Sequence, residues 1–274
     1  MQSQLFHIFR NTPLGRETLL QSVYFCQQVR AIPVVYIPKH IKFLMYFEND
    51  VVQVDLDESY LTAPETAQPH AADLLNEAGF ELKLFEPKNF TASTLPDAPT
   101  HFDFMCCPRS ISDLSSKIGL GYIGPRVRRI VNSARFPVLI TSSVFKPWKS
   151  VTVFFGGSAN SVNGLRLGLR ISRLSDLPLD LFTQADRDPT FYREAVAEAG
   201  LTEEVQARVR DWKFFQHKPL EENLYAVPHD ALCIAGAFGH GIIKDLVFGR
   251  TLEKLHAVLT NNLLIVGPAY AANT

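Results

Sequence analysis

An internal repeat, offset by about 145 residues, restricts the possible folds of this chain more than any other feature. Each copy begins with a short apolar segment, an amphipathic helical segment and a second apolar segment. Pro33 and Pro178 occupy the same place in the two copies. The predicted strand, helix and strand cover residues 5–9, 17–30 and 32–37 in the first copy, and 151–155, 161–173 and 177–182 in the second. Two units of similar fold are therefore predicted.

The later segments of the two copies also correspond. They are 73–78, 81–85, 104–107, Gly124 and 136–140 in the first copy, and 191–199, 212–215, 232–235, Gly249 and 261–265 in the second. Alternating strands and helices form a parallel sheet with helices on both faces. We predict an α/β fold with two tandem doubly wound, Rossmann-like domains, residues 1–143 and 144–274, joined within the polar stretch 141–149.

The composition is that of a folded globular protein. The 274 residues are 46% hydrophobic and 20% charged, and the net charge of −1 provides no basic field for nucleic acid. The apolar runs are shorter than a membrane span, and the N-terminus lacks the pattern of a secretory signal. A cytoplasmic protein that binds neither nucleic acid nor membrane is expected.

The four cysteines, Cys26, Cys106, Cys107 and Cys233, all fall in apolar segments. Free, buried thiols in a reducing compartment are the default interpretation. Cys106 and Cys107 could form a redox pair, but adjacent residues of a strand point to opposite faces of the sheet.

Two glycine turns mark the second copy. Gly236-Ala-Phe-Gly239 follows a predicted strand, and nine residues later Gly249-Arg250-Thr251 precedes a helical pattern at 251–259. Glycine lets backbone N–H groups approach an anion closely, and a helix N-terminus adds a partial positive charge. The two turns could hold a chain of phosphates. Alternatively, the glycines only make tight turns between strand and helix.

These motifs resemble the universal stress protein family. That family has Gly-x-x-Gly, nine residues, Gly-Ser/Thr, a helix and a closing apolar strand, which matches residues 236–268 with the closing strand at 263–266. The start of the second copy, 149–158, matches the family's first strand and its following turn. The resemblance implies a tandem universal stress protein that is nucleotide-responsive, since many members of the family bind ATP while others lack nucleotide.

The resemblance further implies that ATP or ADP binds in the crevice of the second domain. The binding residues expected there are Gly156, Gly157, Gln184, Gly236, Gly239, His240, Gly241, Gly249, Arg250 and Thr251. No catalytic residue and no metal ligand is expected, because the sequence contains no known catalytic or metal-binding motif.

Three of these positions depart from the family pattern. Gly156 replaces the family's Asp after the first strand, and Arg250 displaces the expected hydroxyl by one place to Thr251. Losing a hydrogen bond to a charged carboxylate costs about 1.5–3 kcal/mol, and Arg250 could offset this with a charge-assisted phosphate contact. Alternatively, Arg250 is an exposed residue at the start of the helix. Gln184 replaces an apolar residue of the base pocket, where it could bond an adenine edge or face solvent.

The first copy has lost the glycine motif. Ile111 and Leu114 stand at the first two glycine positions, and Pro125 follows Gly124, where it provides no N–H group. Arg10-Asn11-Thr12 stands where the family has Asp-Gly-Ser, although Gly119 and Gly121 could rebuild an anion site nearby. One usable site, in the second domain, is therefore predicted. Arginines 126, 128, 129 and 135 form either a solvated basic face or a contact with an acidic partner or the other domain.

Two further expectations concern packing. The long segment 39–69 has apolar residues without a clear period, which predicts a packed insertion or lid, or else a ligand or partner surface. The resemblance implies that the closing strands 137–140 and 263–266 lie side by side and make the halves an intramolecular pseudo-dimer, and covering these apolar edges would also prevent aggregation. Whether two whole chains also form a homodimer is left open. The alternatives to nucleotide binding are a scaffold that acts through an unidentified protein partner, and a weak ATPase.

Overall fold

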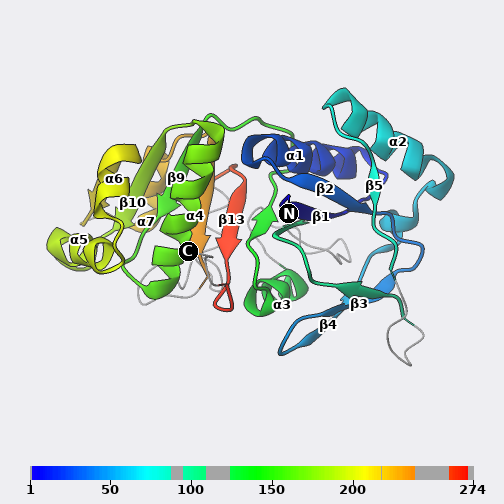
Figure 1. The fold of residues 1–274 in the computed structure, drawn as a ribbon, viewed down its shortest axis with the longest axis horizontal. Coiled ribbons are helices and arrows are strands. Elements are labelled where there is room, and N and C mark those ends of the chain that lie inside the picture. The colour runs from blue at the N-terminus through cyan, green and yellow to red at the C-terminus, as the bar shows by residue number, and fades with distance from the viewer. Residues whose placement is uncertain (1, 88–94, 109–123, 217, 238–258, 271–274) are drawn as a thin grey trace.

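The computed structural model describes residues 2–87, 95–108, 124–216, 218–237 and 259–270. Among these residues, a ten-stranded sheet has the order β11-β10-β9-β12-β13-β8-β7-β1-β2-β5 and runs across the whole molecule (Figure 1). The strands are β1 Gln4–Ile8, β2 Ile32–Tyr36, β5 Lys83–Leu84, β7 Phe104–Cys107, β8 Val138–Ile140, β9 Ser150–Phe154, β10 Leu179–Gln184, β11 Val209–Phe215, β12 Ala231–Gly236 and β13 Leu263–Val266. The predicted mixed α/β fold with a largely parallel sheet is confirmed.

The closing strands β8 and β13 join the two halves of the sheet. They pair antiparallel, with Leu264 opposite Leu139, whereas every other neighbouring pair in the described sheet is parallel. Both strands are fully buried. The prediction that they lie side by side is confirmed, and the pairing removes two apolar edges that would otherwise be open to aggregation.

One face of the sheet is covered by helices from both halves. Helix α1, Pro13–Val29, packs beside α4, Ala159–Ser175, across the line where β8 meets β13 (Figure 1). Around them lie α2 Pro64–Glu77, α5 Pro189–Glu198 and α6 Thr202–Arg208. Buried residues of α1, α4, α5 and α6 and of the strands beneath them form one apolar cluster, which includes Phe25 of the first half and Leu165 of the second, whereas α2 packs on α1 in a separate cluster. The halves therefore share a continuous core on this face.

Two helix starts were predicted too late. Helix α1 begins at Pro13, not at residue 17, because the Thr12 hydroxyl accepts a hydrogen bond from Gly15 N and proline suits the first helical position. Helix α2 begins at Pro64, not at residue 73, and contains Pro69. Since proline usually ends a helix, the pattern before Pro69 gave no helical signal.

Residues 42–55 of the segment 39–69 form a regular structure on the opposite face of the sheet. It contains the antiparallel hairpin β3 Lys42–Tyr46 and β4 Val51–Asp55, and β6 Asp97–Pro99 adds a third strand. Phe43 and Val54 of the hairpin are fully buried against the core. The segment is a packed insertion, one of the expected alternatives, but the sequence pattern did not predict its strands.

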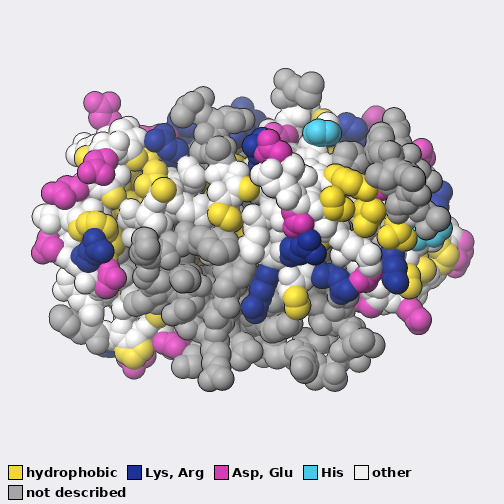
Figure 2. Space-filling view, turned by 90° about the horizontal axis from the view of Figure 1, so that it is seen from below, with side chains coloured by type: hydrophobic (Ala, Val, Ile, Leu, Met, Phe, Trp, Pro, Cys, Tyr) yellow, Lys and Arg dark blue, Asp and Glu magenta, His cyan; other side chains and the backbone are white. Residues whose placement is uncertain are grey.

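Helix α3, Pro125–Ser133, is fastened to this hairpin by ion pairs. Arg129 pairs with Asp50 at 2.6 Å, and Arg126 and Arg135 pair with Asp55 and Glu48. Lys and Arg side chains gather near the middle of this face (Figure 2). The acidic partner considered for these arginines is thus a hairpin of the same half.

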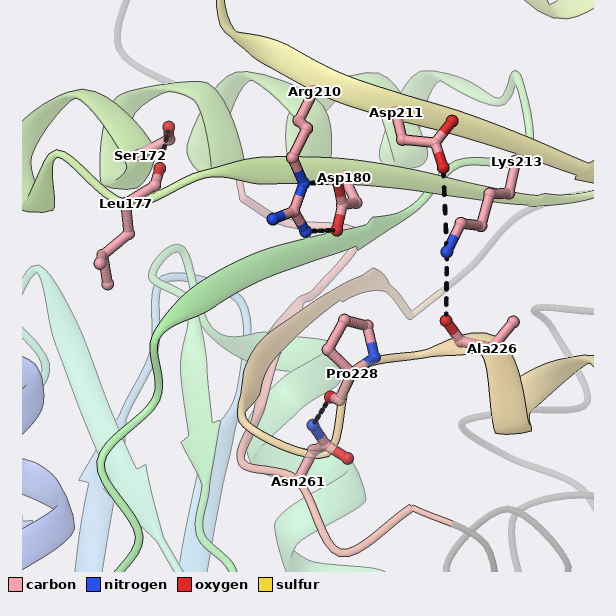
Figure 3. Close-up of polar contacts among 9 residues, drawn as sticks. All are labelled: Ser172, Leu177, Asp180, Arg210, Asp211, Lys213, Ala226, Pro228 and Asn261. Carbon is pink, nitrogen blue, oxygen red and sulfur yellow. Dashed lines mark hydrogen bonds and ion pairs between the residues drawn. The ribbon is translucent and has the colours of Figure 1, made fainter.

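At the outer end of the second half, β10 and β11 are joined by a side-chain pair. Asp180 of β10 is buried, and its carboxylate accepts from the guanidinium of Arg210, with Arg210 Nε at 2.9 Å from Oδ1 (Figure 3). A buried carboxylate needs such a partner, so the pair holds the edge strand in place.

All four cysteines are free and buried, as predicted. Burial raises the pKa of Cys106 to about 12. Cys106 and Cys107 belong to the apolar clusters on opposite faces of the sheet. These thiols are therefore part of the core.

His7 makes folding sensitive to acid. It is 1% exposed, its Nδ1 lies 2.8 Å from Ser22 Oγ, and burial lowers its pKa from 6.5 to about 3. Below about pH 6.5 the unfolded chain takes up a proton that the folded chain does not, so stability falls by about 1.4 kcal/mol per pH unit down to about pH 3.

We therefore compare the loss in free energy of unfolding between about pH 7 and pH 5. This loss should be about 2 kcal/mol smaller in His7→Gln than in the parent chain. Urea unfolding at the two pH values measures the difference. Parallel losses in both proteins would show that His7 does not carry this pH dependence.

Candidate functional site

The candidate site lies where the strand order reverses in the second half. Strand β10 flanks β9 on one side, and β12 flanks it on the other. In doubly wound sheets, ligands bind beyond the carboxyl ends of the strands at such a switch point. The chain places Gly156 and Gly157 just after β9 and Gly236 at the end of β12, so these three predicted residues come to the same edge of the sheet.

The turn after β9 depends on Gly157. Its φ is +73°, and a Cβ atom there would lie 2.8 Å from Cε1 of Phe191. Glycine alone fits both the left-handed backbone and this close contact. The next residue, Ser158, caps α4, because its hydroxyl accepts from Ser161 N at 3.2 Å. The N-terminus of α4, with its partial positive charge, therefore begins beside the end of β9.

Gly236 brings the end of β12 against the first turn of α4. A Cβ atom at this position would lie 2.9 Å from the carbonyl oxygen of Asn160 and 3.2 Å from Ser161 N. The side chain of Asn160 also donates to the carbonyl of Val266, at the end of β13, over 3.2 Å. The ends of β12, β13 and α4 thus form one closely packed unit, in which Asn160 has a positioning part that the sequence motif did not reveal.

Gln184 lies at the same edge, at the end of β10. Its amide already has partners: Nε2 donates to the carbonyl of Lys218 at 3.0 Å, and Oε1 accepts from Asn223 at 2.8 Å. Asn223 belongs to the short helix α7, Leu220–Asn223. Gln184 therefore ties α7 to the sheet, and a bond to an adenine edge would compete with these contacts.

The remaining predicted site residues lie outside the described part of the chain. They are Gly239, His240, Gly241, Gly249, Arg250 and Thr251, together with nearly all of the predicted helix 251–259.

In the first half, Arg10-Asn11-Thr12 stand at the place equivalent to Gly156-Gly157-Ser158, and residues 59–66 of the same half pack against them. Asn11 is buried and donates to the carbonyl of Ala63 at 3.0 Å and to Thr66 Oγ1 at 2.9 Å. Arg10 donates to Ser59 Oγ at 3.2 Å, and its guanidinium lies 5.3 Å from the ring centroid of Tyr60. The segment that follows β2 thus covers the end of β1. Sequence spacing alone could not reveal these contacts.

Two kinds of feature are absent from the described residues. They contain no group of three or more His, Cys, Asp or Glu side chains that could hold a metal ion. In the same part of the chain, no helix is both long and apolar enough to cross a membrane.

Comparison with known proteins shows a similarity in sequence to a universal stress protein. The chain is 28% identical over 194 residues to the universal stress protein Slr1230 of Synechocystis sp. (strain ATCC 27184 / PCC 6803 / Kazusa). This match covers 68% of the chain and 65% of the relative, so it spans just under two thirds of that protein's length. No family model matches the chain.

Solved structures with the same fold cover almost the whole chain. A universal stress protein from Archaeoglobus fulgidus DSM 4304 has a TM-score of 0.65 at 12% identity, and the match covers 97% of this chain and 99% of that one. The cytoplasmic domain of a prokaryotic cation chloride cotransporter has a TM-score of 0.52 at 9% identity, covering 97% and 95%. At such low identity these matches show the fold alone, and fold does not determine function.

Proposed function

Because the chain is related in sequence and in fold to universal stress proteins, we propose that it is a tandem member of that family, with domains at residues 1–143 and 144–274. In this proposal it is a stress-response protein that binds one adenine nucleotide, ATP or ADP, in the second domain. The observation that carries the proposal is the meeting of Gly157, Gly236 and the N-terminus of α4 at the switch point.

The difference between the halves supports a single site. In the second half the strand ends carry glycines, whereas in the first half Arg10 and Asn11 are engaged by the segment after β2. A nucleotide there would have to displace these contacts and leave the buried amide of Asn11 without partners, which costs free energy.

The phosphates should supply most of the binding energy. Gly156 provides no carboxylate for the nucleoside, and the amide of Gln184 is held by Asn223 and Lys218. Backbone N–H groups of the glycine turns, Thr251 and Arg250 remain for the phosphate end. We therefore expect ATP and ADP to bind more tightly than AMP, and raised salt to weaken all three.

Arg250→Ala tests this phosphate-anchored binding. If the guanidinium contacts a phosphate, the affinity for ATP should fall by about 5- to 30-fold, the equivalent of about 1–2 kcal/mol, with little change for AMP. Isothermal titration calorimetry with ATP, ADP and AMP measures both effects. Equal affinity for AMP and ATP would contradict the proposal, and absence of binding by any nucleotide would favour a scaffold that acts through a protein partner. Turnover should stay near background, since no general base is apparent in the sequence.

A further inference from the structure

A groove opens at the outer edge of the first half, away from the candidate nucleotide site. One cavity of about 630 Å³ lies at the ends of β2 and β5 and the start of α2, lined among others by Tyr36, Lys39, Leu61 and Phe85. A second cavity of about 670 Å³ shares Lys39 and Leu61 with it. Hydrophobic side chains with Lys, Arg and His at their margin gather on the side of the molecule that carries β3 and β5 (Figure 2). The space is large enough for a small organic molecule.

Tyr36 gives this groove an unmatched hydrogen-bonding group. The residue is 2% exposed, with its ring 5.8 Å from that of Phe85 and 5.4 Å from that of Phe43. Its hydroxyl is buried and has no hydrogen-bond partner among the described residues. Burial raises the pKa of Tyr36 to about 12, so at neutral pH the hydroxyl can donate. Such buried polar groups are rare and call for a partner.

The second half shows what this position requires for packing alone. Tyr36 pairs with the last residue of β1, and the equivalent partner of the last residue of β9 is Phe182. Phe182 stacks on Phe215 with 4.7 Å between ring centroids, whereas Tyr36 meets Phe85 edge to face at 5.8 Å. A phenylalanine is therefore sufficient to fill this place in the sheet, and the first half adds a hydroxyl that packing does not need.

The described residues beside this position also differ between the halves. Beyond β10, Asn223 of α7 bonds Gln184 at the edge of the sheet. In the first half, the residues at the ends of β2 and β5 line an open cavity. The unpartnered hydroxyl thus belongs to a residue that lines this cavity.

We propose that this groove binds a small aromatic carboxylate. Its ring would lie against the apolar wall that includes Leu61 and Phe85, and its carboxylate would accept from the Tyr36 hydroxyl and pair with Lys39. Glu86 also lines the cavity, which disfavours ligands of higher negative charge, such as nucleotides. The ligand is therefore a monoanion.

Titration with phenylacetate, followed by NMR chemical shifts of the ¹⁵N-labelled full chain, tests the proposal. We expect saturable binding that is about five- to tenfold weaker in Tyr36→Phe and in Lys39→Gln. Phenylacetamide, which has the same ring and no charge, should bind clearly more weakly than phenylacetate. Tyr24→Phe is the matched control, because its hydroxyl donates to the Trp148 carbonyl at 2.7 Å, outside the groove, and its removal should leave binding unchanged.

A thermal melt separates a ligand role from simple packing. Without phenylacetate, Tyr36→Phe should be at least as stable as the parent chain, because it removes an unpaired buried hydroxyl. With phenylacetate, it should show less stabilisation than the parent. The proposal is overturned if the parent chain does not bind phenylacetate, if phenylacetamide binds equally well, or if Tyr36→Phe binds phenylacetate as the parent does.

Discussion

Gly267→Ala is expected to lower the free energy of unfolding by about 3 kcal/mol or more, because it places a methyl group inside the junction of the two halves. Gly267 directly follows β13, and a Cβ atom there would lie 1.9 Å from the carbonyl oxygen of Val131 and 3.0 Å from its carbonyl carbon. Val131 is a buried residue of α3, in the first half. The clash is with backbone, so it cannot be relieved by rotating a side chain.

Urea unfolding compared with Gly79→Ala measures the effect of the clash. A Cβ atom at Gly79 would meet nothing within 4 Å, but its φ is +81°. That variant should therefore lose only about 1 kcal/mol, from backbone strain. Similar losses in the two variants would show that the halves do not approach as closely at Gly267 as the structure has them.

Gly239→Val is expected to weaken ATP binding by at least about 100-fold, if the glycine motif holds phosphate as proposed. Gly239 lies outside the described residues, and its part is inferred from the match to the family motif. A branched side chain there would keep the phosphate from the backbone N–H groups, and losing two charge-assisted bonds costs about 3 kcal/mol or more. Calorimetric titration measures the loss, with circular dichroism as a check that the variant folds.

Leu114→Ala provides the control for that result. Leu114 stands at the equivalent place in the first half, where the glycine motif is missing. It should leave the affinity for ATP unchanged. Weaker binding in Leu114→Ala, or full affinity in Gly239→Val, would assign the nucleotide to a different place.

Much of the fold could be predicted because local patterns determine it. The apolar strand 263–266 was predicted with the observed bounds, and the pairing of β8 with β13 was expected from the resemblance to universal stress proteins and from the need to cover two apolar edges. The resemblance to universal stress proteins, first drawn from the glycine motif and the repeat, is confirmed in sequence and in fold.

The missed elements depend on contacts that are distant in sequence. Hairpin β3–β4 is stabilised by burial of Phe43 and Val54 against the sheet and by pairing with α3, none of which a local period reveals. Helix α6, Thr202–Arg208, was not predicted, because it is a short segment that runs directly into β11.

In the candidate site, too, some features could be predicted from local sequence patterns, whereas others depend on contacts that are distant in sequence. The positions of Gly156, Gly157 and Gly236 at one edge of the sheet follow from the doubly wound fold, which the alternation of strands and helices predicted. The partners of Gln184 could not be predicted, because they come from residues more than thirty positions later in the chain. The contacts of Asn11 with Ala63 and Thr66 likewise join segments that no short motif connects.

The stoichiometry of nucleotide binding tests the central proposal most directly. Native mass spectrometry of the full chain with excess ATP or ADP should show one bound nucleotide per chain, as expected if only the second domain has a usable site. Two nucleotides per chain would contradict the single site, and none with either nucleotide would contradict nucleotide binding altogether.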